Sequence, residues 1–308
     1  MISFEEANKI IRESIIHLGS EEVPLRQSLH RVLAEDVISD IEMPPFNKSA
    51  VDGYACKKAD IQKELEVIEI IPAGNIPEKK ITTGQCAKIM TGAVVPEGAD
   101  TVLMVEYTEE TAKNKIRFLK DKTNSNICYQ AEDVKNGQKV LTSGIFIEPQ
   151  HIAVMASVGY SEVFVAKQPG VGIISTGDEL VEPSEKPGIS QIRNSNAWQL
   201  IGQVERMNAI PDYLGIASDD RDATFQMINK AFEKNDVVLL TGGVSMGDYD
   251  FVPGILEECG LEILFKSIAV QPGRPTLFGK KENKFCFGLP GDPVSSFGQF
   301  EQIGRAHV

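Results

Sequence analysis

The feature that most constrains the fold is a short apolar run that leads directly into a glycine-rich loop. Residues 237–240 read VVLL, and residues 241–250 then supply three glycines, two hydroxyls and two carboxylates. Such a run is typical of a buried parallel strand, whose following loop lies at the carboxyl edge of the sheet. Glycines let backbone N–H groups approach a phosphorylated ligand there, and carboxylates can hold Mg²⁺. The pattern predicts an anion and metal site, with an ordinary tight turn as the alternative.

The start of the chain is predicted to be helical. Ser3 and Glu6 form a capping box, and the apolar residues after them recur at helical spacing, which predicts an amphipathic helix that ends near Gly19. A second short helix fits residues 25–33.

The predicted secondary structure then changes twice along the chain. From about residue 61 to 139, strand-like runs are punctuated by Gly, Pro, Asn and Asp, which predicts a small all-β insertion. Beyond residue 168 the order becomes strand, turn, helix, with a strand at 171–174 and helices over 196–207 and 224–232. The last half is therefore predicted to be an α/β layer fold with ligand loops at one edge.

Composition narrows the class of partner. The 308 residues are 42% hydrophobic and 24% charged, as in a soluble protein of two or three domains, and the formal charge of −13 argues against nucleic acid or an anionic membrane as partner. An acidic amino terminus and the absence of any apolar run of about 20 residues predict a cytoplasmic protein. The five cysteines and four histidines show no metal or disulfide spacing.

Two loops of the first half carry candidate site residues. Asp52 stands in the proline-stiffened segment 43–55, where it either projects a carboxylate toward a cleft or only forms a rigid hinge with Gly53. Thr91 stands in segment 89–100, which is either a ligand contact or a plain hairpin-like turn.

Loops of the second half repeat this chemistry. Thr176 and Gly177 follow the strand at 171–174, where a phosphate would meet the sheet edge. Asp178 and Glu179 could bind metal, and Asp178 could equally cap a helix. One of Asp219 and Asp220 is expected to cap the next helix.

Positive charge and a further strand-to-helix turn complete the set of candidates. Lys266 and Arg274 offer the charge that an oxyanion needs, with a plain surface role as the alternative. The turn at 287–296 contains Gly291 and suits an anion, although a proline at the first helical position explains it equally.

Six motifs in order resemble the molybdopterin molybdotransferase family, which includes MoeA and the E domain of gephyrin. They are PPFNKSAVDGYA, MTGAVVPEGAD, ISTGDEL, LLTGGVSMGDYD, QPGRPT and GLPGDPVSS, over about residues 1–302. The resemblance implies a transferase of molybdenum-cofactor biosynthesis that inserts molybdate into adenylylated molybdopterin and, with Mg²⁺, releases AMP. It also implies an elongated homodimer, with the upstream adenylyltransferase as a possible partner.

The implied fold is multidomain α/β plus β. It has a MoaB/Mog-like α/β molybdopterin-binding domain (1–19 and 169–302), a connecting domain (20–47 and 140–168) and an inserted β domain (48–139). The family's carboxy-terminal β domain is absent from the chain, and residues 303–308 read as a non-native tail. Impaired activity of the 308-residue chain is expected on that basis.

The resemblance also assigns roles. Asp52 and Thr91 would reach across the dimer, with Asp133 contributing nearby. The other implied residues act in the α/β domain: Glu179, Asp248 and Asp250 on the metal, Asp219 or Asp220 in the same acidic wall, Thr176, Gly177, Gly242, Gly243, Ser245 and Gly291 on the pterin nucleotide, and Lys266 and Arg274 on molybdate.

The chain departs from the family pattern at several places. Ser267 and Gln271 stand where members often carry lysines. Asp292 replaces the usual Asn and is expected to be unfavourable beside an anion unless metal-bound or protonated. His30 replaces a usual glycine, at what is expected to be a harmless helix position.

Two other functions fit parts of the chain. The α/β part also resembles the molybdopterin adenylyltransferase domain, although that enzyme lacks the β insertion. A non-catalytic, gephyrin-like scaffold is the second alternative.

Overall fold

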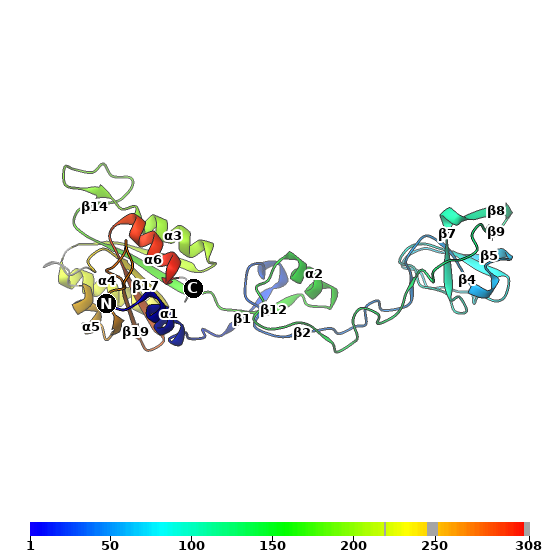
Figure 1. The fold of residues 1–308 in the computed structure, drawn as a ribbon, viewed down its shortest axis with the longest axis horizontal. Helices are drawn as coiled ribbons and strands as arrows, with labels where there is room; N and C mark the ends of the chain where they lie inside the picture. The colour runs from blue at the N-terminus through cyan, green and yellow to red at the C-terminus, as the bar shows by residue number, and fades with distance from the viewer. Residues whose placement is uncertain (219, 245–251, 305–308) are drawn as a thin grey trace. The chain divides into compact units, whose positions relative to one another are not determined.

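The computed structural model describes residues 1–218, 220–244 and 252–304. The chain divides into two compact units, one made of residues 1–21 and 165–308 and the other of residues 22–164. The boundary falls within β1 (Ser20–Pro24) and β12 (Glu162–Ala166), which pair with each other (Figure 1). Among the described residues, no helix has the length and apolar character needed to cross a bilayer.

A six-stranded sheet forms the centre of the first unit, with the order β16-β13-β17-β20-β19-β18. The strands are β16 (Ile210–Ala217), β13 (Gly170–Thr176), β17 (Val237–Thr241), β20 (Lys284–Leu289), β19 (Leu277–Lys281) and β18 (Glu262–Phe265). The first four are parallel, and β19 is antiparallel to both neighbours. The carboxyl ends of β13, β17, β20 and β18 therefore share one edge with the start of β19.

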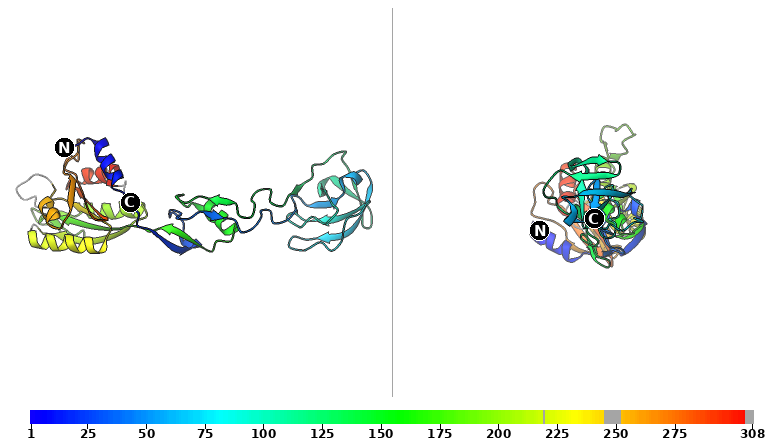
Figure 2. Two further views of the ribbon diagram at one scale, coloured as in Figure 1. Left: turned by 90° about the horizontal axis from the view of Figure 1, so that it is seen from below. Right: turned by 90° about the vertical axis from the view of Figure 1, so that its right-hand side faces the viewer.

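Helices cover both faces of this sheet, as Figure 2 shows. One face carries α1 (Phe4–Glu13), α3 (Asn196–Arg206) and α6 (Pro293–Gln302), and the other carries α4 (Arg221–Lys234) and α5 (Val252–Glu258). In α3, Ala197, Leu200 and Val204 are fully buried, which is the spacing of a single helix face. The short parallel pair β14 (Leu180–Val181) and β15 (Ile192–Arg193) lies outside the main sheet.

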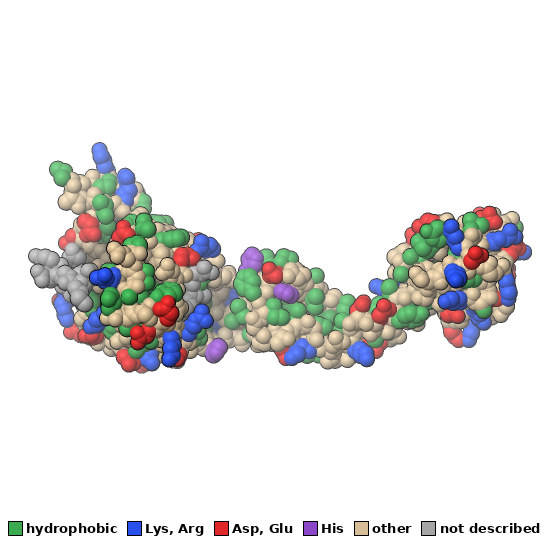
Figure 3. All heavy atoms as spheres, viewed as in Figure 1, with side chains coloured by type: hydrophobic (Ala, Val, Ile, Leu, Met, Phe, Trp, Pro, Cys, Tyr) green, Lys and Arg blue, Asp and Glu red, His purple; other side chains and the backbone are tan. Residues whose placement is uncertain are grey.

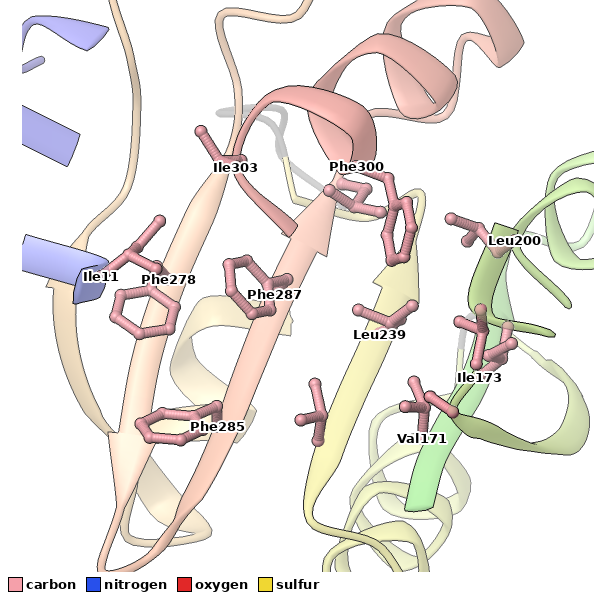
Figure 4. Packing of buried hydrophobic residues seen from close by; sticks show 14 of the residues in the cluster. Ile11, Val171, Ile173, Leu200, Leu239, Phe278, Phe285, Phe287, Phe300 and Ile303 are labelled. Carbon is pink, nitrogen blue, oxygen red and sulfur yellow. The ribbon is translucent and has the colours of Figure 1, made fainter. Parts of the chain in front are cut away.

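Phenylalanines from two adjacent strands fill the core on the α1, α3 and α6 side (Figure 4). The ring centroids of Phe278 and Phe287 are 4.8 Å apart, and those of Phe278 and Phe285 are 5.9 Å apart. Phe300 of α6 and Ile11 of α1 close over the same cluster and are fully buried. Because aromatic side chains bury large areas, this cluster fixes α1 and α6 on the sheet.

The second unit contains a six-stranded sheet of order β7-β4-β6-β5-β9-β8. Its strands are β7 (Thr101–Met104), β4 (Gly53–Cys56), β6 (Gln85–Ile89), β5 (Glu64–Ile71), β9 (Lys115–Phe118) and β8 (Thr108–Ala112). Both faces of β4 are buried, with Tyr54 and Cys56 in one apolar cluster and Ala55 in another. The sheet therefore packs an apolar cluster on each face.

The rest of the second unit consists of short pieces. They are β2 (Val37–Ile38) paired with β11 (Lys139–Leu141), β3 (Lys48–Ser49) paired with β10 (Ile127–Cys128), α2 (Pro149–Ser157), and the 3₁₀ turns η1 (Leu25–Gln27), η2 (Lys58–Asp60) and η3 (Val105–Tyr107). On the face seen in Figure 3, basic and acidic side chains are interspersed in both units.

The predicted start of the chain needs correction. The first helix ends at Glu13 rather than near Gly19, and the predicted helix at 25–33 is wrong, since only η1 is helical there. The His30 and Leu33 N–H groups donate to Ile147 and Ile145 carbonyls, each at 2.8 Å, so they are not available to a helix. His30 has a φ of 63°, which favours glycine and is not a helix position.

Candidate functional site

A pocket lies at the carboxyl edge of the first unit's sheet, where β13, β17 and β20 end. The turns that follow β13, β17 and β20, parts of β14 and β15, and the start of α3 form its wall. The lining residues are Thr176, Glu179, Leu180, Ile192, Arg193, Asn194, Ser195, Asn196, Thr241, Gly242, Gly291 and Pro293. The predicted residues Thr176, Glu179, Gly242 and Gly291 thus share one pocket.

Two glycines leave space above the Thr176 hydroxyl. Gly242 and Gly243 have φ values of 89° and 63°, and a Cβ on Gly243 would lie 2.8 Å from Thr176 Oγ1. Thr176 is 6% exposed, and its Oγ1 has no hydrogen-bond partner among the described residues. A buried hydroxyl without a partner is costly, so this space suits a polar ligand atom.

The backbone N–H groups of two predicted phosphate binders are already engaged. Gly242 donates to the Leu289 carbonyl at 3.2 Å and Gly177 donates to the Ala217 carbonyl at 3.3 Å. These glycines instead leave space for neighbouring groups. At Gly177, a Cβ would lie 2.3 Å from a Glu179 carboxylate oxygen. Gly177, at a φ of 137°, therefore allows the Glu179 carboxylate to lie against the turn.

Two asparagines before and at the start of α3 escaped the sequence reasoning. Asn194 Oδ1 accepts from Ser175 Oγ at 3.0 Å, and Asn194 Nδ2 donates to the Tyr213 hydroxyl at 2.9 Å. Asn196 Nδ2 donates to Thr241 Oγ1 and to the Gly291 carbonyl, each at 2.8 Å. The only signal in the sequence is the pair of amides around Ser195, directly before a predicted helix.

Asp292 has a structural role. Its carboxylate caps α6 by accepting from the Ser295 N–H at 2.9 Å and from Ser295 Oγ at 2.6 Å, and Pro293 occupies the first helical turn. The Ser295 hydroxyl and N–H hold the pKa of Asp292 below its usual range. The sequence made this charge unfavourable beside an anion unless it was metal-bound or protonated, and the structure gives it a role as an ionised helix cap.

We predict that Asp292→Ala lowers the stability of the first unit near neutral pH, whereas Asp292→Asn preserves the cap. Because the folded-state pKa of Asp292 is depressed, its contribution is present above the usual pKa of 3.8 and is lost as the pH falls through the folded value. Urea unfolding from pH 7 to pH 3 checks this result. Equal stability of the Ala variant and the parent at pH 7 would contradict it.

The two cationic candidates lie at the same sheet edge but do not line the pocket. Lys266 follows the end of β18, and Arg274 precedes β19 in a segment that packs on α6, where Gln299 Nε2 donates to the Pro272 carbonyl at 3.4 Å. Lys266 Nζ is 2.9 Å from Glu257 Oε1 in an exposed ion pair. The Lys266 ammonium has three N–H donors, so an oxyanion bound there would share it with the Glu257 carboxylate.

The predicted acidic wall lies mainly outside the described residues. Asp220 is the N-cap of α4 and accepts from the Ala223 N–H at 2.8 Å, as expected for one of the two aspartates. The N-cap alternative for Asp178 is wrong, because β14 follows it and not a helix. The remaining aspartates of the predicted wall, Asp219, Asp248 and Asp250, lie outside the described residues, as does Ser245, which was predicted to bind the nucleotide.

The described part of the chain does not by itself make a metal site. No group of three or more His, Cys, Asp or Glu side chains placed to hold an ion is found within residues 1–218, 220–244 and 252–304. Glu179 is the only one of the three predicted metal ligands in this range.

A carboxylate–threonine pair lies at one end of the second unit's sheet. Asp52 Oδ1 accepts from the Thr91 N–H at 2.7 Å and from Thr91 Oγ1 at 2.9 Å, and both residues are exposed. These two donors lower the pKa of Asp52, so its carboxylate is ionised at neutral pH. These residues stand in separate loops of the sequence, and the fold brings their side chains into hydrogen-bonding contact.

Asp133 lies on a different segment of the second unit. Its N–H donates to the Met43 carbonyl at 2.9 Å, next to the pairing of Val134 with Met43. No hydrogen bond joins Asp133 to Asp52 or Thr91 in the described structure. Its predicted contribution beside them stays a prediction.

We predict that Thr176→Val keeps or raises stability and weakens ligand binding. The hydroxyl has no partner among the described residues, so replacing it with a methyl group of similar shape removes a burial cost of about 1 kcal/mol. Urea unfolding followed by Trp198 fluorescence measures the first effect and titration with AMP the second. A loss of more than about 1 kcal/mol in stability would show that the hydroxyl is partnered in solution.

Comparisons with known proteins identify relatives along nearly the whole chain. Residues 2–159 match the MoeA N-terminal region (domain I and II), and residues 172–307 match the family described as a probable molybdopterin binding domain. The molybdopterin molybdenumtransferase of Bacillus subtilis is 40% identical over 92% of this chain and 68% of its own length. That of Staphylococcus aureus strain Mu50 is 38% identical over 93% of this chain and 70% of its own length.

Solved structures agree with the sequence relatives. The molybdopterin biosynthesis MoeA protein of Pyrococcus horikoshii OT3 superposes with a TM-score of 0.84 at 35% identity, over 99% of this chain and 78% of its own. The similarity therefore extends over both units and includes the pocket-bearing α/β sheet together with the β-sheet that carries Asp52 and Thr91. The chain belongs to the MoeA family of molybdopterin molybdenumtransferases.

Proposed function

We propose that this chain inserts molybdate into molybdopterin, using adenylylated molybdopterin as substrate and releasing AMP. The observation that carries the proposal is the 40% identity to a molybdopterin molybdenumtransferase over 92% of the chain. The pocket supports it, because the buried Thr176 hydroxyl lies beneath two glycines at the edge of a parallel sheet and has no hydrogen-bond partner among the described residues. Nucleotides and phosphates bind at such edges in α/β proteins.

The chain's own groups act by orientation. The Thr176 hydroxyl donates to a phosphate oxygen, and Gly242 and Gly243 let that oxygen approach because no Cβ fills the space. The two dithiolene sulfurs bond to molybdenum, and one molybdate oxygen leaves as water with the two thiol protons. Water then cleaves the pyrophosphate link and releases AMP, so no covalent intermediate on the protein is needed. Fixing the two reactants in one geometry is the main contribution that we assign to the protein.

We propose Mg²⁺ binding on the basis of the sequence prediction, which named Glu179, Asp248 and Asp250 as its ligands. Glu179 lines the pocket, and Asp248 and Asp250, the other predicted ligands, lie outside the described residues. Since the described side chains do not form a site for the ion by themselves, no step of the reaction is assigned to it here.

Molybdate is proposed to bind at the positively charged part of the same sheet edge. Lys266 and Arg274 follow β18 and precede β19, which end and begin at the edge where the pocket lies. Lys266 would share its ammonium donors between the oxyanion and Glu257, and two cations offset the charge of an oxyanion.

The assembly is also a proposal. We propose a cytoplasmic homodimer in which Asp52 and Thr91 of one subunit complete the pocket of the other, with Asp133 near them and the upstream adenylyltransferase as a possible partner. The exposed and ionised Asp52 carboxylate supports this, because Thr91 holds it in place at the surface, where it can meet a second subunit.

Molybdate-dependent AMP release from adenylylated molybdopterin tests the function. The purified chain is incubated with substrate, Mg²⁺ and molybdate, with the Bacillus subtilis relative as positive control for the substrate. Release that requires molybdate supports the proposal. Formation of adenylylated molybdopterin from molybdopterin and ATP would instead indicate an adenylyltransferase. Because impaired activity of the 308-residue chain is expected, release that is slower than that of the relative still supports the proposal, and only the complete absence of both activities in a folded chain would favour a scaffold.

A further inference from the structure

The orientation of the Asn196 side chain is fixed by its partners. Asn196 is 8% exposed and lies on the pocket wall at the first residue of α3. Its Nδ2 donates to the Gly291 carbonyl and to Thr241 Oγ1, and Thr241 Oγ1 in turn donates to the Pro290 carbonyl at 3.2 Å. A carbonyl can only accept, so the NH₂ group must face Gly291 and the amide cannot be flipped.

This orientation leaves an acceptor without a donor. Asn196 Oδ1 is buried and has no hydrogen-bond partner among the described residues. Asn194, two residues earlier, is different, because its Oδ1 accepts from Ser175 Oγ and from the Ala197 N–H. Of these two asparagines, only Asn196, which bonds the ends of β17 and β20 beside the pocket, has an oxygen without a partner among the described residues.

The two unpartnered atoms of the pocket differ in chemistry. Thr176 Oγ1 is a hydroxyl that can donate to an anionic oxygen, whereas Asn196 Oδ1 can only accept. Phosphate and molybdate oxygens are acceptors and carry negative charge near neutral pH, so they cannot satisfy Asn196 Oδ1. The group that belongs opposite this oxygen must carry an N–H or O–H donor.

We propose that Asn196 is a specificity-determining residue whose Oδ1 accepts a hydrogen bond from an N–H edge of the substrate's nitrogen heterocycle. This inference rests on the proposed function, which supplies two such heterocycles, the adenine and the pterin of adenylylated molybdopterin. Both rings present N–H donors. The ribose presents O–H donors, which are identical in AMP and in its analogue without the amino group, so comparing those two ligands separates the ring from the sugar. In this arrangement Thr176 donates to the anionic part of the ligand, and Asn196 accepts a hydrogen bond from one of its rings.

Ligands that lack the donor test this assignment. Calorimetric titration compares AMP with purine riboside 5′-monophosphate, which lacks only the amino group, and compares pterin with its 2-deamino and 3-methyl analogues. Each series is measured on the parent chain, on Asn196→Ala and Asn196→Ser, and on Ser195→Ala. Ser195 lines the same pocket and makes no side-chain cap hydrogen bond, so it is a matched control.

The parent chain is expected to bind the donor-deleted analogue of one ring about ten- to a hundredfold more weakly than the intact ring, because a buried acceptor is then left unpaired. In Asn196→Ala and Asn196→Ser, the ratio of the affinity for the intact ligand to the affinity for its analogue should fall to about twofold or less. In Ser195→Ala this ratio should remain as in the parent. A general loss of structure would weaken all ligands alike and leave the ratio unchanged. The ring whose ratio collapses identifies the source of the donor.

Two results overturn the assignment, and they can be told apart. Equal affinity of the parent for intact and donor-deleted ligands, or a ratio preserved in the Asn196 variants, overturns the role of Asn196 alone. Failure of the folded parent to bind either AMP or pterin overturns the proposed function and this inference with it. The ligand series on the parent is sufficient for both, so the test does not depend on a variant that folds.

Discussion

Gly53→Ala is expected to unfold or severely destabilise the second unit. A Cβ on Gly53 would lie 1.9 Å from the Leu103 carbonyl oxygen and 3.1 Å from Val102 Cγ1. Gly53 begins β4, which is paired on both sides, opposite Met104 of β7 and Ile89 of β6. Because the clashing atom belongs to the backbone of a paired strand, no side-chain rotamer relieves the contact, and we expect a loss of about 3 kcal/mol or more.

Two spectroscopic probes separate this effect from a general one. Trp198 is the only tryptophan and belongs to the first unit, so its fluorescence reports on that unit, while far-ultraviolet circular dichroism reports on both. In urea, Gly53→Ala should move the circular dichroism transition to lower concentration and leave the Trp198 transition in place. A circular dichroism transition equal to that of the parent would contradict the clash.

Gly202→Ala provides a control of the same chemical kind. Gly202 lies inside α3, and a Cβ there would meet nothing within 4 Å. Alanine is a better helix former than glycine by about 1 kcal/mol, so this variant should raise the Trp198 transition slightly. Opposite responses of the two glycines, in two different units, would show that local space and not the substitution itself decides the outcome.

The α/β sheet and its helices could be predicted because their signals are local. The apolar runs at β13 and β17 and the helical spacing of α3 and α4 are visible in short windows, and the observed elements lie within a few residues of those predicted. The segment at 25–33 shows the limit. Its helix-like pattern was overridden by hydrogen bonds from His30 and Leu33 to residues more than 100 positions away, which no local pattern reports.

The site could be predicted only as a set of loops. Glycines and hydroxyls after strand-like runs mark Thr176, Gly242 and Gly291 as neighbours once the strands are placed in parallel. The sequence could not show that the Gly242 N–H would be used by Leu289, or that Asn196 would lie on the same wall, because both depend on tertiary contacts. Asp292 likewise reads as an unfavourable charge beside an anion until its hydrogen bonds from Ser295 are known.

Replacing Asp52 should abolish turnover without unfolding the chain. The carboxylate is exposed and its only two hydrogen bonds in the described structure come from Thr91, so the apolar clusters of the second unit do not depend on it. If the ionised group acts on the bound substrate, as proposed, Asp52→Ala and Asp52→Asn should each reduce molybdate-dependent AMP release about a hundredfold or more. Unchanged release from either variant would remove Asp52 from the reaction.

Thr91→Val separates the charge of Asp52 from its positioning. The variant keeps the Thr91 N–H, which has the larger effect on the pKa of Asp52, and removes the hydroxyl. Losing a donor raises the pKa of a carboxylate, so the acid limb of the pH–rate profile should move to higher pH while activity near neutral pH falls only modestly. Since Asp52→Asn has no group to titrate, its residual rate should lack that limb. An acid limb that stays in place in Thr91→Val would show that a different group controls it, because the hydroxyl bonds Asp52 directly.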